Sequence, residues 1–106
     1  MDKKDRYLKV LHSAQNILKD YKIDEIGKMS FISSILMNEF QEWIFCGFYR
    51  TVDKELLEIG PYQGNIIPCG HIAFNRGVCG ASARERKTII VNDVSTFPGY
   101  ISCDSE

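Results

Sequence analysis

Apolar positions in the first forty residues recur every three or four residues, which is the spacing of one face of a helix. Between Lys3 and Lys19 these positions alternate with charged and amide side chains, and they are Tyr7, Leu8, Leu11, Ala14, Ile17 and Leu18. A second segment of this kind runs from Asp24 to Phe40, and Asp24 has the side chain of a helix N-cap. The pattern predicts two amphipathic helices, each with one buried face.

From Trp43 the pattern favours strands. "WIFCGFYRT" is rich in aromatic residues, "VDK" supplies turn residues, and "ELLEIG" can return as an antiparallel strand, which predicts a hairpin from Trp43 to Gly60. Glycines and prolines in "GPYQGNIIPCG" indicate an ordered loop. After a short apolar segment, residues 71–74, we expect a short helix in "ASARERK" and a core strand in "TIIV".

These elements predict an α/β or α+β fold, with helices packed on an antiparallel sheet, in a single domain spanning residues 1–106. A sheet this small leaves unpaired edges. We therefore expect the domain to be incomplete at its C-terminus.

The charge balance argues against polyanionic partners, because 13 Lys and Arg face 14 Asp and Glu, for a net charge of −1. We predict no nucleic-acid or membrane partner. The N-terminus lacks an apolar signal segment, and no apolar run is long enough to cross a bilayer, so we expect a cytoplasmic protein.

In a reducing compartment, four cysteines are more often buried thiols, metal ligands or redox groups than a disulfide framework.

The four cysteines stand in different settings. Cys46 lies between aromatic residues in a predicted strand, where a small buried thiol is ordinary. Cys69 follows a proline in a glycine-rich loop. Cys79 is near the expected start of a helix, where free backbone amides and Arg76 would favour the thiolate. Cys103 is in a loop shaped by a proline and a glycine.

Other chemistry finds little support in the sequence. His71 with three of the cysteines offers ligand types that zinc accepts, but the paired short spacings of zinc sites are missing, so we predict no metal. We expect His71 to be a strand residue and His12 a solvated one. Neither the phosphate-binding glycine patterns nor the serine-hydrolase elbow occurs.

Taken together, "CGFYR", "GPYQG", "IAFNRGVCGASA", "KTIIVNDV" and "FPGYISCDS" resemble, in this order, the free methionine-R-sulfoxide reductases, enzymes built on a GAF domain. The resemblance extends from about Phe45 to the last residue. Three cysteines match in context and spacing, since Cys79 follows Cys69 by 10 residues and Cys103 follows Cys79 by 24. The resemblance implies a GAF-like domain.

The resemblance also implies roles for single residues. It makes Cys103 the nucleophile that reduces free L-methionine-(R)-sulfoxide and keeps the oxygen as a sulfenic acid. Cys79 is the usual resolving thiol, with Cys69 as an alternative, and the resulting disulfide is reduced by thioredoxin. Phe45, at a position where the family has tryptophan, and Tyr49 form an apolar wall for the substrate methyl group. Cys46 matches no functional position.

The same resemblance implies no metal or organic cofactor, an external thioredoxin and NADPH system, and a homodimer. Family members continue past the nucleophile loop into strands and a helix that carry substrate-binding carboxylates, and Asp104 and Glu106 do not match those acids. Two alternatives therefore stay open. One is a non-catalytic GAF domain that binds a small ligand or senses oxidants, and the other is a partial chain that does not fold alone.

Overall fold

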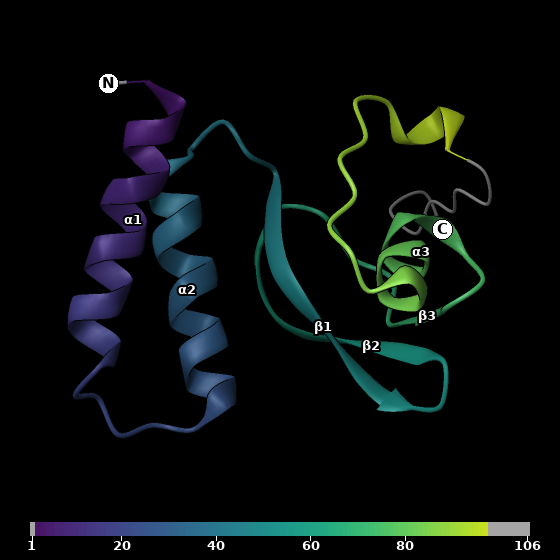
Figure 1. Cartoon of the computed structure of the whole chain (residues 1–106), viewed down its shortest axis with the longest axis horizontal. Helices are drawn as coiled ribbons and strands as arrows, with labels where there is room; N and C mark the ends of the chain where they lie inside the picture. Colours follow the sequence, from purple (N-terminus) through teal and green to yellow (C-terminus); the bar gives the residue numbers. More distant parts are fainter. Residues whose placement is uncertain (1, 98–106) are drawn as a thin grey trace. The chain divides into compact units, whose positions relative to one another are not determined.

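The computed structural model describes residues 2–97, so the predicted nucleophile Cys103 lies outside the described part of the chain. In chain order the elements are α1 (Lys3–Leu18), α2 (Glu25–Glu39), β1 (Phe45–Asp53), β2 (Leu56–Gly64), β3 (His71–Ala73), α3 (Gly77–Glu85) and the short 3-10 helix η1 (Val94–Thr96) (Figure 1). The three strands form a sheet in the order β1-β2-β3, and β2 pairs with β3 antiparallel. The α+β class predicted from the sequence is confirmed.

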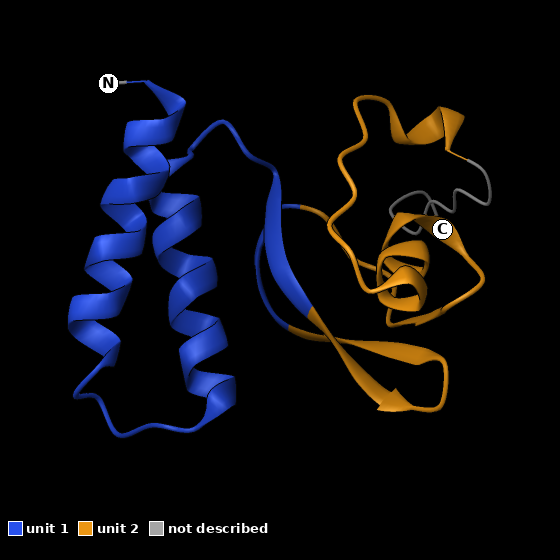
Figure 2. Cartoon of the chain, viewed as in Figure 1, with its two compact units in different colours: residues 1–48, 61–65 blue, residues 49–60, 66–106 orange. Residues whose placement is uncertain are grey.

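The chain divides into two compact units, coloured separately in Figure 2. The first comprises residues 1–48 and 61–65, and the second comprises residues 49–60 and 66–106. The β1–β2 hairpin contributes backbone to both units.

In the first unit, aspartates begin both helices. The Asp2 carboxylate accepts a hydrogen bond from the Asp5 amide at 2.8 Å, and the Asp24 carboxylate accepts one from the Gly27 amide at 3.0 Å. These contacts satisfy amides that have no partner within the helix. The predicted N-cap role of Asp24 is confirmed.

Phe40 is the centre of the first unit's core. It directly follows α2, its exposed fraction is 0%, and its ring stacks on Trp43 at 4.4 Å between centroids. Tyr7 of α1 contacts the same ring at 4.7 Å, and the Arg6 guanidinium lies over it at 4.4 Å. Rings and a cation packed in this way attach α1 to the end of α2.

Arg6 adds a charged layer around the aromatic cluster. Its guanidinium pairs with Glu39 at 3.1 Å and with Glu42 at 3.0 Å, while Lys9 pairs with Glu39 at 2.9 Å. The hydrogen bonds that Arg6 donates to Glu42 and Glu39 raise the pKa of Arg6, and the bonds that Glu39 accepts from Lys9 and Arg6 lower the pKa of Glu39. All of these groups reach solvent, so they fix geometry more than they add stability.

The predicted apolar face of α1 is buried less than expected. Tyr7, Leu8, Leu11 and Ile17 are all exposed, and Val10 is the buried residue of this helix. Within the first unit α2 is the element packed against α1, and a single neighbouring helix covers only a narrow strip of its surface. The expectation of one wholly buried face was wrong for that reason.

The first half of the predicted loop "GPYQGNIIPCG" is strand. β2 continues to Gly64, where φ is 142° and a Cβ atom would collide with the Ile44 carbonyl oxygen. The next amide, of Asn65, donates to that carbonyl at 3.1 Å. Because Gly64 has no side chain, the backbone of β2 can lie close to the start of β1. The glycine therefore indicates a close backbone contact and not a loop.

In the second unit, β3 and α3 form a small core with β2. Leu57 of β2 lies opposite Ile72 of β3, and both are buried together with Ala81 of α3. Gly80 allows this packing, because a Cβ there would lie 2.5 Å from the Ala73 carbonyl oxygen. Because α3 packs on β3, the position of Cys79, the neighbour of Gly80, is set by this contact.

The prediction of a core strand in "TIIV", residues 88–91, is wrong. These residues have no strand conformation, and Ile90 is 88% exposed. A strand exists only when a partner strand takes up its backbone hydrogen bonds, and none of the strands between residues 2 and 97 pairs with this segment. β-Propensity alone did not decide its conformation.

Replacing Phe40 with alanine should lower the free energy of unfolding of the first unit by about 3–5 kcal/mol, because it opens a cavity and removes the stacking partner of Trp43. Urea denaturation followed by fluorescence of Trp43, the single tryptophan, measures this loss directly. Tyr21→Ala, at an exposed position, is the control and should change stability little. A loss below about 1 kcal/mol for Phe40→Ala would contradict the role assigned to this ring.

Candidate functional site

The second unit brings together three of the residues singled out in the sequence. Tyr49 comes from β1, Cys69 from the loop before β3, and Cys79 from α3. The partly buried Tyr49 hydroxyl donates a hydrogen bond to the Cys69 carbonyl at 2.7 Å. Burial raises the pKa of Tyr49, and the charge of a nearby Cys79 thiolate raises it further. The tyrosine therefore lies close to both cysteines and keeps its proton at neutral pH.

The backbone around Cys69 is attached to the sheet at two successive carbonyls. The Gly70 carbonyl accepts a hydrogen bond from the Ile59 amide of β2 at 2.9 Å, next to the bond that Tyr49 makes to Cys69. Cys69 is disulfide-bonded, whereas Cys46 and Cys79 are free thiols. Among the cysteines between residues 2 and 97, Cys69 is therefore the one whose sulfur is bonded to another sulfur.

Cys79 is the third residue of α3, which begins at Gly77, four residues before the helical segment expected from the sequence. Gly77 has φ of 65°, a conformation that favours glycine. The expected lowering of the Cys79 pKa is not found, because protein atoms around the sulfur remove part of its hydration and raise the pKa. The residue is nevertheless exposed, so the thiol is accessible to reagents but mostly protonated at neutral pH. Position at a helix start was not sufficient to activate it.

Phe45 and Cys46, at the beginning of β1, belong to the first unit. The Phe45 ring stacks on Tyr62 of β2 at 5.5 Å between centroids. Sequence reasoning missed Tyr62, because it placed "GPYQG" in a loop; the strand continuation brings the two rings together. Cys46 is partly buried, and burial raises the pKa of its thiol, in keeping with a packing role.

His71 is a strand residue, as expected, and its ring contacts the Glu58 carboxylate at 2.9 Å across the β2–β3 pair. His12 is exposed on α1. Within residues 2–97, no three His, Cys, Asp or Glu side chains cluster in a way that could hold a metal ion. The helices of this described part also lack the combined length and apolar character that a bilayer crossing requires.

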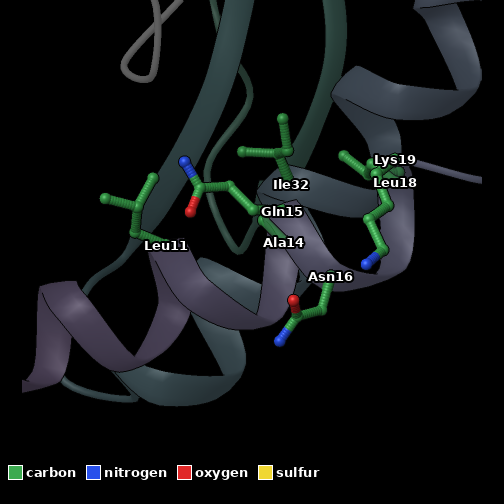
Figure 3. A pocket seen from close by; sticks show the side chains of 7 residues that line it. All are labelled: Leu11, Ala14, Gln15, Asn16, Leu18, Lys19 and Ile32. Atoms are coloured by element: carbon green, nitrogen blue, oxygen red, sulfur yellow. The ribbon is translucent and has the colours of Figure 1, made fainter.

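A shallow apolar groove of about 600 Å³ lies in the first unit (Figure 3). Ile32 of α2 forms one wall, and the other lining residues are Leu11, Ala14, Gln15, Asn16, Leu18 and Lys19. None of them is a thiol or a carboxylate, so this groove offers no redox or acid chemistry. In the second unit, a smaller pocket of about 290 Å³ beside the hairpin turn is lined by Lys54, Glu55, Ala73, Phe74, Asn75 and Arg84.

Comparison with solved structures defines the class of fold. A putative GAF sensor protein from Burkholderia vietnamiensis matches with a TM-score of 0.89 and 32% identity, over 99% of this chain and 65% of that one. No protein-family model matches the chain. The fold is that of a GAF-like domain.

Individual relatives carry a more specific name. Free methionine-R-sulfoxide reductase of Saccharomyces cerevisiae is 34% identical over 97% of this chain, and the enzyme of that name from Escherichia coli is 32% identical over 82%. The Neisseria meningitidis reductase, solved with its substrate, matches with a TM-score of 0.88 and 31% identity over 99% of this chain and 62% of that one. The chain is therefore a homologue of proteins named free methionine-R-sulfoxide reductase, as the sequence motifs predicted. It spans 60% of the length of the yeast relative and 55% of the length of the E. coli relative.

The raised pKa of Cys79 leads to a prediction about its reactivity. Since burial disfavours the thiolate, alkylation of Cys79 by iodoacetamide should be slow at neutral pH and should reach half its maximal rate above the ordinary thiol pKa of about 8.5. Mass spectrometry of the peptide containing Cys79 gives this rate against pH. An alkylation midpoint below that value would show instead that the helix start activates the thiol.

Proposed function

We propose that the chain carries the thiol chemistry of a reductase that converts free L-methionine-(R)-sulfoxide to methionine. The observation that carries this proposal is the grouping of Tyr49, Cys69 and Cys79 in one unit, at the positions that the motifs assign to the reaction. Similarity to proteins named for this activity supports it.

In the first step, the Cys103 thiolate attacks the sulfoxide sulfur while a proton is delivered to the sulfoxide oxygen. The oxygen is transferred to the cysteine sulfur, and methionine leaves. The substrate sulfur is reduced by two electrons, and Cys103 is oxidised to a sulfenic acid. Phe45 and Tyr49 form the apolar wall for the substrate methyl group in this proposal.

In the second step, a thiol condenses with the sulfenic acid, a disulfide forms and water is released. Two observations favour Cys69 over Cys79 as this resolving thiol. Cys69 is disulfide-bonded in the structure, whereas Cys79 is free and has a raised pKa. Cys79 remains the second route, since it is accessible and lies close to Tyr49.

Thioredoxin then reduces the disulfide by thiol–disulfide exchange and is itself regenerated with electrons from NADPH. The cycle needs no metal and no organic cofactor bound to the chain. A thioredoxin-dependent cycle suits a reducing compartment, so the proposal includes a cytoplasmic location, and it includes a homodimer, as the motifs imply.

A second function is favoured by one observation, the similarity to a protein described as a putative GAF sensor. In that case the domain would bind a small ligand or record oxidation in a cysteine pair without turnover. The two functions differ in whether methionine is released repeatedly, which an assay of the chain decides.

The test is oxidation of NADPH by thioredoxin reductase and thioredoxin with free methionine-(R)-sulfoxide as substrate. Turnover should disappear in Cys103→Ser. Cys69→Ser should lose steady-state turnover by at least about tenfold, yet release close to one equivalent of methionine in a single turnover, because only the recycling step is blocked.

Cys79→Ser should keep most of the activity, and Cys46→Ser, outside the proposed machinery, is the matched control. Loss of steady-state turnover in Cys79→Ser with normal rates in Cys69→Ser would assign the resolving role to Cys79. A folded chain that forms a cysteine disulfide but releases no methionine would support the sensor function and refute the enzyme.

A further inference from the structure

The loop that carries Cys69 into β3 is only partly covered, since Pro68 and Cys69 are half-buried and their neighbours Ile67 and Gly70 are exposed. Ile67 is 74% exposed, and no atom lies within 4 Å of the place where a Cβ of Gly70 would stand. Pro68 restricts its own backbone but has no amide to donate. Besides the disulfide at its sulfur, Cys69 is held through its backbone, because its own carbonyl and that of Gly70 both accept hydrogen bonds.

Two strands of the second unit provide those bonds. Ile59 of β2 holds the Gly70 carbonyl through its backbone amide, which any residue except proline could do. The Cys69 carbonyl is held by a side chain, the Tyr49 hydroxyl, at 2.7 Å. Because the raised pKa keeps this hydroxyl protonated, it remains a donor throughout the neutral range. Phenylalanine would keep the ring but lose the donor.

We propose that Tyr49 is a positioning residue for Cys69, whose hydroxyl bond to the Cys69 carbonyl fixes the loop so that the Cys69 sulfur is aligned for disulfide formation. This role rests on the proposed thiol cycle and goes beyond the apolar contact with substrate that the motifs assign to Tyr49. It acts on the resolving step, after methionine has left. A residue of the substrate wall would have its effect earlier, on substrate binding.

The experiment bypasses the substrate by using hydrogen peroxide. Peroxide oxidises the Cys103 thiol to a sulfenic acid and is reduced to water, and Cys69 then condenses with the sulfenic acid, releasing a second water. Samples quenched with dimedone and iodoacetamide are resolved by mass spectrometry into sulfenic acid, disulfide and free thiols. Tyr49→Phe should form the disulfide about fivefold more slowly than the unmodified chain, the factor expected for one lost hydrogen bond, and should accumulate the sulfenic acid.

Three comparisons complete the design. Tyr21→Phe, at an exposed tyrosine outside the site, should match the unmodified chain, and 4-aminophenylalanine at position 49, which restores a donor, should recover most of the rate. Of these variants, only Tyr49→Phe should show faster amide hydrogen exchange at residues 66–70 than the unmodified chain. This last readout does not depend on Cys103.

Equal rates of disulfide formation in Tyr49→Phe and the unmodified chain would overturn the positioning role while leaving the cycle intact. Absence of the disulfide in the unmodified chain, with sulfenic acid trapped on Cys103, would instead refute the proposed resolving step itself. Loss of cooperative unfolding in Tyr49→Phe would also overturn the proposal, since the hydroxyl would then support the whole unit and not the loop.

Discussion

The pairing of β1 with β2, which are neighbouring strands of the sheet, positions the residues around Cys69. Its two-residue turn, Lys54 and Glu55, needs a left-handed backbone at Glu55, whose φ is 57°, and the Glu55 carbonyl accepts a hydrogen bond from the Phe74 amide after β3. The turn fixes which residues of the two strands lie together. Tyr49 and Ile59, one from each strand, both reach the backbone around Cys69 as a result.

The two units achieve stability in different ways. The first relies on an aromatic cluster around Phe40 with charged groups at its margin, while its helices keep much apolar surface exposed. The second has a small aliphatic core made by Leu57, Ile72 and Ala81, and uses backbone hydrogen bonds to order its loop. A small core leaves few side chains to hold a loop, so a single hydroxyl can have a large share in placing it.

The environments of the cysteines show that accessibility and activation are separate properties. Cys79 is exposed, yet its pKa is raised, and Cys46 is partly buried with a raised pKa as well. Neither described free thiol is therefore a strong nucleophile at neutral pH. The thiolate is also the form that condenses with a sulfenic acid, so a raised pKa slows the resolving step as well, in keeping with the proposal that Cys69 and not Cys79 takes this role.

Local periodicity, caps and turn residues were enough to predict the two N-terminal helices, the hairpin and the α+β class. The sequence also indicated Tyr49, Cys69 and Cys79 through motifs, and the roles of these three residues stay predictions. Cys103 and its neighbours lie outside the described residues, so their roles remain predictions from the sequence.

How those residues meet depends on contacts between segments that are far apart in the chain. Whether Gly64 ends a strand or begins a loop depends on the approach of Ile44, and residues 88–91 have strand propensity but no partner strand among the described residues. The pKa of Cys79 depends on how much protein surrounds it, which no local pattern encodes. The bond from Tyr49 to Cys69 joins residues twenty positions apart, and it exists because strand pairing brings β1 beside the loop that precedes β3.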